Sequence, residues 1–300
     1  MRRRGFLGLT ITACVAAATG GCVTISPVAT TGDFPVAAGV QLANSPTYLQ
    51  MAARAGGRGQ IVIGVKDDQP GLGYLDPRTR AYTGFDIEIA ELVAAGLGFR
   101  RDQVQFVAVQ SVNRENALQN RSVDLVVASY SYNPARAALV SFAGPYFATR
   151  EGLLVRDDES TVTSIADITA PRRVCSVINS TPLSELPRLT GAVPQARQNY
   201  SECISALTKH SVDGVYTDLA VLAGYAAQDP AHLRILPVTD NSPPQLYGIG
   251  LPGNDPALTD KINEILRTAE KDGTWQAVFN ATLAPSGIEA TMPPIGRWPS

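Results

Sequence analysis

A short polar segment in the middle of the chain has the residue types needed to bind a carboxylate. It reads Asn133-Pro134-Ala135-Arg136. Asparagine is a preferred helix N-cap and proline suits the first helical turn, so we expect Arg136 in that turn, beside backbone N–H groups that lack helical partners. A guanidinium gives a carboxylate two parallel hydrogen bonds, and a helix N-terminus adds partial positive charge. The segment therefore predicts an anion site.

Charged residues also stand where two predicted strands end. The apolar run 61–65 predicts a buried strand, and Lys66, Asp67 and Asp68 follow it before a Pro-Gly turn. Asp218 follows another predicted strand and precedes a predicted helix, so its residue type and position give it the ordinary role of a helix N-cap. Both positions are places where a sheet presents side chains to a ligand.

Other chemistries have little support in the sequence. The segment 248–253 fits a nucleotide-binding glycine pattern by spacing, but Pro252 interrupts the expected helix entry and no convincing acidic partner for a ribose follows. His210 and His232 are far apart, so we expect neither a metal site nor a cofactor. A net charge of −2 over 300 residues argues against nucleic acid as the main partner.

The elements that would position these residues alternate between strand and helix, which predicts an α/β protein. The expected strands lie at 61–65, 104–109, 125–128, 174–177, 214–217 and 247–251. The expected helices lie at 86–95, 113–120, from 182 onward, at 219–227 and at 258–273. A chain of 300 residues, 45% of them apolar, fits two α/β units of about a hundred residues each better than one.

The N-terminus has the features of an export signal. Three arginines precede an apolar run that is too short to span a bilayer, and small residues follow it. Arg3-Arg4 resembles a twin-arginine signal, although an ordinary secretory route remains an alternative. The sequence Thr-Gly-Gly before Cys22 resembles a bacterial lipobox, in which the cysteine is acylated after cleavage. We expect a signal peptide at 1–21 and a lipid on Cys22 that anchors the protein to the outer face of the cell membrane; the alternative is a simple secreted protein.

Regions beside the folded body are poor in regular patterns. The segment 22–59 is rich in Thr, Ser, Pro, Ala and Gly, which predicts a tether with one short helix near 46–54. The segment 285–300 predicts a loose C-terminal tail. Because Cys14 leaves with the signal and Cys22 takes lipid, Cys175 and Cys203 remain as a pair in an oxidising compartment, and we expect a disulfide between them.

One segment, which begins at Gly84 and reads GFDIEIAELVAAGL, resembles the signature of the family 3 bacterial extracellular solute-binding proteins, the polar amino acid receptors of ABC importers. Similar segments follow in the family's order: VDLVVASYSYNPAR, SFAGPYF, CSVINSTPL, GVYTDLAVL, YGIGLP and EKDGTW. The resemblance implies a two-lobed periplasmic-binding-protein-like fold of type II, with an open α/β sheet in each lobe and a hinge of two crossover segments. Lobe one would comprise 60–149 plus 246–284, and lobe two 150–245.

The same resemblance implies where a ligand binds. Arg136 matches the arginine that binds the α-carboxylate of the ligand, and Ser129 and Ser131 match residues that bind its ammonium and carboxylate. On lobe two, Thr181 matches a further carboxylate contact, although Asn179-Ser180 stands where the family usually has Gly-Thr. Asp218 matches the counter-charge of the α-ammonium.

Lys66 aligns with a position that is basic in some receptors for acidic amino acids. A base there would meet a side-chain carboxylate, so glutamate is the favoured ligand, followed by aspartate or glutamine. The alternative is a solvated Lys66 with Asp67 or Asp68 pointing inward, which would suit a neutral or basic ligand. Aromatic residues at three positions are predicted pocket walls, with core packing as the alternative for each: Tyr74, Phe85 and Tyr130.

Three functions follow from this resemblance. We expect a monomeric receptor that is not an enzyme and that delivers an amino acid to the transmembrane subunits of an ABC permease. One alternative is a sensor lipoprotein that signals to a membrane partner. The other is an enzyme on the same fold, similar to cyclohexadienyl dehydratase, which would need a tuned general acid or base.

Overall fold

The computed structural model describes residues 33–189, 191–238 and 243–298. The predicted signal peptide and the predicted lipid attachment site Cys22 lie outside this part of the chain. Among the described residues, no helix combines the length and the apolar character needed to cross a membrane.

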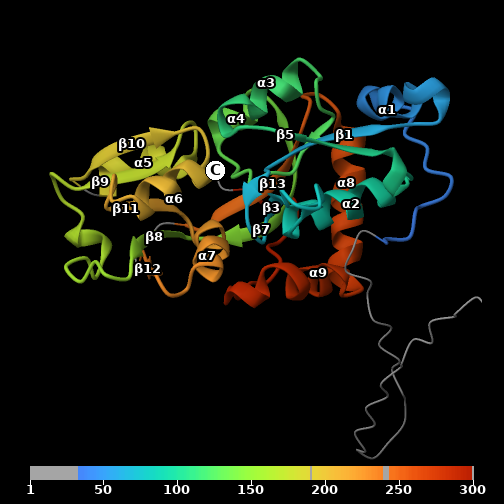
Figure 1. Cartoon of the computed structure of the whole chain (residues 1–300). Coiled ribbons are helices and arrows are strands. Elements are labelled where there is room, and N and C mark those ends of the chain that lie inside the picture. The colour runs from blue at the N-terminus through green and yellow to red at the C-terminus, as the bar shows by residue number, and fades with distance from the viewer. Residues whose placement is uncertain (1–32, 190, 239–242, 299–300) are drawn as a thin grey trace, which may run out of the picture.

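Lobe one is built on a five-stranded sheet with the strand order β5-β1-β6-β13-β7 (Figure 1). β1 runs parallel to β5 and β6, whereas β13 runs antiparallel to β6 and β7. The strands are β1 (Ile61–Val65), β5 (Val104–Ala108), β6 (Leu125–Val126), β7 (Ser141–Thr149) and β13 (Gln245–Leu251). The helices of this lobe are α1 (Pro46–Gly57), α2 (Phe85–Gly96), α3 (Arg114–Gln119), α4 (Pro134–Ala137), α8 (Pro256–Lys271) and α9 (Thr274–Thr282).

Lobe two has its own five-stranded sheet, with the order β10-β9-β11-β8-β12, and lies beside lobe one in Figure 1. Its strands are β8 (Glu151–Arg156), β9 (Arg173–Val177), β10 (Val193–Arg197), β11 (Gly214–Asp218) and β12 (Leu233–Pro237). Its helices are α5 (Thr181–Leu189), α6 (Tyr200–Thr208) and α7 (Leu219–Gln228). The predicted two-lobed α/β fold is confirmed.

A small antiparallel sheet lies on the lobe-one side of the interface and consists of β2 (Asp68–Gln69), β3 (Gly73–Leu75) and β4 (Tyr82–Thr83). Four short 3-10 helices complete the described structure: Arg101–Gln103, Ser111–Asn113, Ile165–Asp167 and Ala284–Ser286.

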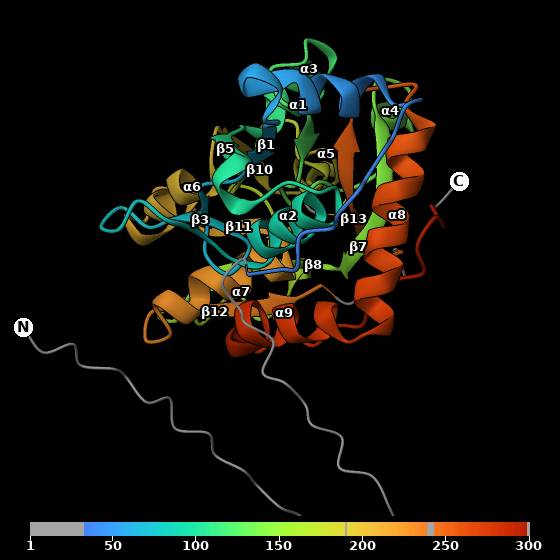
Figure 2. The same cartoon turned by 90° about the vertical axis from the view of Figure 1, so that its right-hand side faces the viewer.

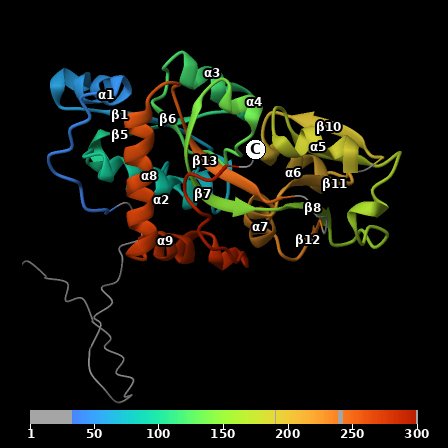
Figure 3. The same ribbon diagram turned by 180° about the vertical axis from the view of Figure 1, so that it is seen from behind.

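The chain passes between the lobes where β7 ends at Thr149 and β8 begins at Glu151 (Figure 3). It returns before β13, which begins at Gln245. Both positions fall near the predicted crossings. The division of the chain at 149/150 and 245/246 stays a prediction.

Glycine at position 84 permits the sharp entry into α2. Gly84 has a φ of +118°, and a Cβ on it would lie 2.3 Å from the carbonyl oxygen of Leu72. The next residue, Phe85, packs its ring at 5.7 Å from Trp275 and 6.1 Å from Phe279. The prediction that Phe85 lines the ligand pocket is therefore wrong, because its fully buried ring belongs to the aromatic core of lobe one.

The segments on either side of the body pack more closely than predicted. The predicted tether is already in contact with lobe one at Phe34, which is buried, and it runs beside α8 toward α1 (Figure 2). α1 buries Met51 completely. In the predicted loose tail, Trp298 stacks on Tyr132 at a ring distance of 4.6 Å. The predictions of a tether and of a loose tail are therefore wrong at these residues. In both segments a large apolar side chain packs against lobe one, and its burial stabilises the ordered conformation.

The predicted disulfide is present. Cys175 of β9 is bonded to Cys203 of α6, with 5.5 Å between the Cα atoms, and both residues are fully buried. The bond fixes α6 on the sheet of lobe two.

Candidate functional site

Arg136 lies where the two lobes meet. The side chain of Asn133 accepts a hydrogen bond from the backbone N–H of Arg136 at 2.8 Å, so the predicted N-cap is confirmed. The guanidinium donates from Nη1 to Ser131 O at 2.6 Å within lobe one. It also reaches lobe two, where Nη1 donates to Thr181 Oγ1 at 3.2 Å and Nη2 to Asn179 O at 2.7 Å. Because α4 has only four residues, the guanidinium rather than the helix supplies the positive charge.

Glu115, which the sequence did not single out, supports this arginine. Its Oε1 lies 3.2 Å from Nε of Arg136 and accepts a hydrogen bond from the Tyr130 hydroxyl at 2.9 Å. The ring of Tyr130 lies 5.4 Å from the guanidinium of Arg136. Tyr130 thus contacts both members of the Glu115–Arg136 pair, and its role as a pocket wall stays a prediction. Burial lowers the pKa of Arg136 to about 10, with the like charge of Arg114 as the next cause.

Ser129, which follows β6, has an unusual backbone conformation. Its φ is +43°, and its backbone N–H donates to Asp86 Oδ2 at 2.7 Å, while its hydroxyl donates to Gln69 Oε1 at 2.8 Å. Asp86 also accepts a hydrogen bond from Tyr146 at 2.7 Å, and burial raises the pKa of Asp86 to about 6. These bonds fix the backbone of Ser129 within lobe one.

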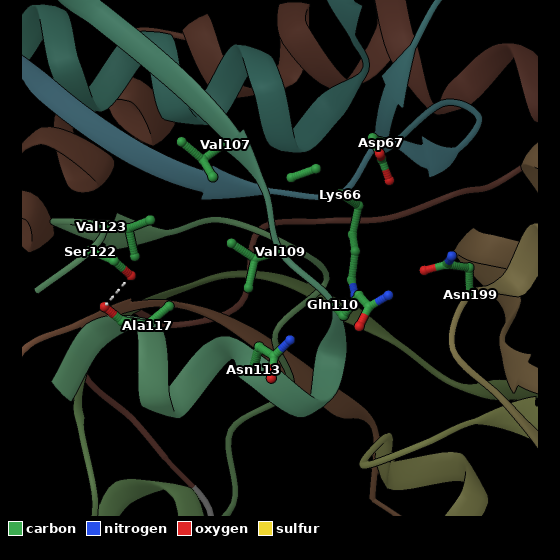
Figure 4. Close-up of a pocket in the computed structure, with 11 residues that line it drawn as sticks. Lys66, Asp67, Val107, Val109, Gln110, Asn113, Ala117, Ser122, Val123 and Asn199 are labelled. Atoms are coloured by element: carbon green, nitrogen blue, oxygen red, sulfur yellow. Dashed lines mark hydrogen bonds between the residues drawn. The ribbon is translucent and has the colours of Figure 1, made fainter. Parts of the chain in front are cut away.

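Lys66 is buried at the end of β1, with 4% of its surface exposed. Figure 4 shows its side chain running toward Gln110, and its Nζ donates to Ser111 Oγ at 2.8 Å. Burial lowers the pKa of Lys66 from 10.5 to about 7, and the like charge of Arg114 acts in the same direction. Among the ion pairs of the described residues, none contains Lys66. The alternative of a solvated lysine is therefore wrong.

Asp68 ties the two lobes together. Its Oδ2 accepts a hydrogen bond from the backbone N–H of Ser201 at 3.0 Å, in the first turn of α6. Its carbonyl oxygen accepts one from the hydroxyl of Tyr225 on α7. Tyr74, a predicted pocket wall, lies opposite Asp68 in the small sheet and is partly exposed.

A second buried arginine, Arg114, escaped the sequence analysis. Its Nη1 donates to the carbonyl oxygens of Ala128 at 3.1 Å and Ser129 at 3.3 Å, and its guanidinium lies 4.4 Å from the ring centre of Tyr130. Only 3% of the residue is exposed, and its Nε has no hydrogen-bond partner among the described residues. A signal was present in the sequence, because Arg114 and the fully buried Leu118 are four residues apart and share one helix face.

Asp218 faces these cations from lobe two. Its Oδ2 accepts a hydrogen bond from the hydroxyl of Tyr247 at 2.6 Å, whereas its buried Oδ1 finds no hydrogen-bond partner in the part of the chain that the structure describes. Asp218 occupies the predicted N-cap position of α7, but its side chain makes no capping hydrogen bond there. Burial raises the pKa of Asp218 to about 6. Glu151 stands opposite Asp218 in the sheet, and burial followed by the charge of Asp218 raises the pKa of Glu151 to about 8.

We call five of these side chains the interlobe cluster: Lys66, Arg114, Glu115, Arg136 and Asp218. Two cavities adjoin it. One, of about 420 Å³, extends from Lys66 on lobe one to Asn199 on lobe two (Figure 4). The other, of about 360 Å³, lies beside Arg136 and includes Thr181. Among the described residues, no three side chains are arranged to hold a metal ion. The arrangement thus suits a small, charged organic molecule held between two lobes.

Residues 61–282 match the bacterial extracellular solute-binding proteins, family 3. The chain belongs to this family. Its function is therefore to bind a solute, not to catalyse a reaction on one, and the family's extracellular character agrees with the predicted export.

Individual family members are similar over most of the chain. The glutamate-binding protein GluB of Corynebacterium efficiens is 35% identical over 233 residues, which cover 75% of this chain and 79% of that protein. The ABC transporter glutamine-binding protein GlnH of Bacillus subtilis is 30% identical over 225 residues, which cover 73% and 80%. The solved structure of an ancestral arginine-binding protein bound to arginine aligns with a TM-score of 0.68 at 27% identity, covering 75% of this chain and 98% of that one.

Proposed function

We propose that this protein is an extracytoplasmic receptor that binds glutamate between its two lobes and presents it to an ABC permease. The observation that carries the preference for an acidic ligand is Lys66, a buried ammonium without a carboxylate partner among the described residues. A buried charge without a counter-ion is costly, so a site that keeps one is suited to a ligand that brings the opposite charge. The similarity to GluB supports the same ligand.

The α-amino acid group of the ligand is bound by Arg136, Thr181 and Asp218. The Thr181 hydroxyl accepts a hydrogen bond from Arg136 and so keeps its own proton for an α-carboxylate. Arg136 keeps one Nη2 donor beyond its four protein contacts for the same group. The unpaired Oδ1 of Asp218 receives the α-ammonium. Ser129 and Ser131 complete the wall between these two charges.

Delivery to a permease requires export and attachment at the membrane. We place the cleavage site before Cys22 and a lipid on that residue, which leaves the segment from 22 to the packed residue Phe34 as the tether.

Exchange of the bound ligand requires the lobes to separate about the two crossovers near Thr149 and Gln245. The lipid anchor is tested by Cys22→Ala, which should release the protein from the membrane fraction of the producing cell. A Cys22→Ala variant that stays in the membrane fraction would contradict the lipid anchor.

Thermal unfolding of ligand-free protein tests the proposed function. The mature domain is dialysed from urea without a reductant, which removes bound ligand and keeps the disulfide, and it is then heated with saturating glutamate, aspartate, glutamine or arginine. A ligand at a hundred times its Kd stabilises by about 2.7 kcal/mol, which raises the Tm of a protein of this size by roughly 5–10 °C. We expect glutamate to give the largest rise.

Two variants and a control connect that rise to the site. Arg136→Met and Asp218→Asn should each lose the response to every amino acid, because each exchange leaves one charge of the α-amino acid group without its partner. Arg267→Met, an exchange on the exposed face of α8, should respond as the wild type does. A largest rise with arginine, or an unchanged response of both site variants, would contradict the proposal.

A further inference from the structure

Glu151 is a buried acid at the crossover that the proposed function does not use. It is the first residue of β8, directly after the chain leaves β7 (Figure 3), and 5% of its surface is exposed. Its Oε1 is buried and has no hydrogen-bond partner among the described residues. In the sheet it stands opposite Asp218, the last residue of β11. Residues paired in this way carry their side chains on the same face, with Cβ atoms about 4.5–5.5 Å apart.

The two acids form a pair that collects negative charge in a buried place. Asp218 is 4% exposed, and the charge of Asp218 acts on Glu151. The carboxyl group of Glu185 on α5 adds its charge to both members of the pair. None of the ion pairs in the described ranges contains Glu151 or Asp218. Like charges that share a buried site favour a state in which one of them holds a proton.

The surroundings decide which member of the pair holds that proton. The hydroxyl of Tyr247 on β13 donates to Asp218 Oδ2 at 2.6 Å and so favours the ionised form of Asp218. Burial raises the pKa of Asp218 to about 6, whereas burial and then the charge of Asp218 raise the pKa of Glu151 to about 8. At pH 7 the proton therefore resides on Glu151. The charged and titratable groups close to the pair are, from lobe one, Arg114, Arg136 and Tyr247 and, from lobe two, Glu185 and Tyr200.

We propose that Glu151 is a positioning residue for the ammonium of the ligand: it shares one proton with Asp218 in the ligand-free protein, and this proton is released when the ammonium binds. This inference rests on the proposed function, which places the α-ammonium at Oδ1 of Asp218. The step is balanced, because a pair with one negative charge becomes a pair with two that holds the ammonium, and the proton passes to the buffer. Glu151 acts through Asp218 and couples the binding of an amino acid to pH.

The size of the effect follows from the charge that the ligand brings. An opposite charge within about 4–6 Å lowers the pKa of a carboxyl group by about 1–3. Starting from a pKa of about 8 for Glu151, binding at pH 7 should release between about 0.4 and 0.9 protons per ligand. Because a proton is released, the contribution of Glu151 makes binding tighter as the pH rises.

Calorimetric titrations count these protons. Glutamate is titrated at pH 7 in phosphate and in imidazole buffer, which differ in their heats of protonation, into the wild type, Glu151→Gln and the control Glu270→Gln. Glutamine is a neutral isostere of protonated glutamate, so Glu151→Gln should still bind glutamate but release fewer protons, by about 0.4–0.9 per ligand. Lys66 is present in all three proteins, so the difference isolates Glu151. Glu270 is exposed on α8, and its exchange should leave the proton count unchanged.

A second reading of the same variants separates this role from a purely structural one. The ratio of the wild-type affinity to that of Glu151→Gln should rise about three- to fivefold between pH 7 and pH 8. A residue that only supports the start of β8 would change the affinity by the same factor at both pH values. A constant ratio, or equal proton counts in the two proteins, overturns the inference.

Failure of the proposed function gives a different result. If the wild type binds no glutamate, the proposed ligand is wrong, and the same titration with the amino acid that binds tests Glu151, because every α-amino acid brings an ammonium. If the wild type binds glutamate and the proton counts agree, only the role of Glu151 fails.

Should Glu151→Gln not fold, infrared difference spectra of the wild type with and without glutamate at pH 7 decide the question. The inference requires that the carbonyl band of a protonated carboxyl group disappears when glutamate binds. A spectrum in which no such band is lost overturns it.

Discussion

Lys66→Met should make the ligand-free protein more stable while weakening its binding of glutamate. Burial lowers the pKa of Lys66 from 10.5 to about 7, which corresponds to roughly 5 kcal/mol against the charged form. The exchange also removes the hydrogen bond to Ser111, and a hydrogen bond to a charged group is worth about 1.5–3 kcal/mol. The difference leaves a net gain of about 2–3.5 kcal/mol in the free energy of unfolding at pH 6.

The gain should depend on pH with a definite sign. Below pH 7 the ammonium is charged in both the folded and the unfolded protein, so the cost of burying it is fully present. Between pH 7 and 10.5 the unfolded chain holds a proton that the folded protein has released, so wild-type stability rises with pH. The advantage of Lys66→Met therefore shrinks as the pH increases.

Urea unfolding at pH 6 and pH 9, followed by tryptophan fluorescence on stripped protein, measures this effect. Lys209→Met is the matched control, because Lys209 is exposed and its exchange should change the free energy of unfolding by less than about 0.5 kcal/mol. The reasoning is refuted if Lys66→Met is less stable than the wild type at pH 6, or if its advantage is the same at both pH values.

Three further predictions concern pH, the disulfide and contact between the lobes. Glutamate should bind most tightly between about pH 6 and 7, because higher pH discharges Lys66 and lower pH protonates Asp218; calorimetry across pH 5–9 would show a monotonic change if this is wrong. Reducing the bond between Cys175 and Cys203, which lie 28 residues apart, should lower the free energy of unfolding by about 3–4 kcal/mol; an unchanged urea midpoint with dithiothreitol contradicts this. Asp68→Ala removes a hydrogen-bond acceptor for the first turn of α6, so glutamate binding should weaken by about fivefold and the radius of gyration in solution scattering should increase. An unchanged affinity together with an unchanged radius of gyration would contradict this prediction.

The sequence predicted the framework well where several signals agreed. The strand Ile61–Val65 was predicted with its bounds, and the helix that follows Gly84 was predicted to within one residue at each end. An apolar run, acidic residues in the first helical turn and a glycine at the required position all indicate the same structure there. The packing of the C-terminal segment was not predicted, because a single contact such as that of Trp298 with Tyr132 produces no periodic pattern in the sequence.

The candidate site was predicted less completely than the fold. The sequence located Lys66, Arg136 and Asp218, and the structure brings them to the same interface; their roles toward a ligand stay predictions. Arg114 and Glu115 were missed because a charged pair on a short helix is normally solvated. Their burial depends on β6 and Tyr130, which come close to them only in the folded protein.

The most direct test of the account is a calorimetric titration of stripped wild-type protein at pH 6.5 with glutamate and, separately, with glutamine. The two ligands differ in one charge and hardly in size. The ratio of their affinities therefore measures the charge preference of the interlobe cluster. The account predicts that glutamate binds about a hundredfold more tightly, or roughly 2.7 kcal/mol. Equal affinities, or tighter binding of glutamine, would contradict it.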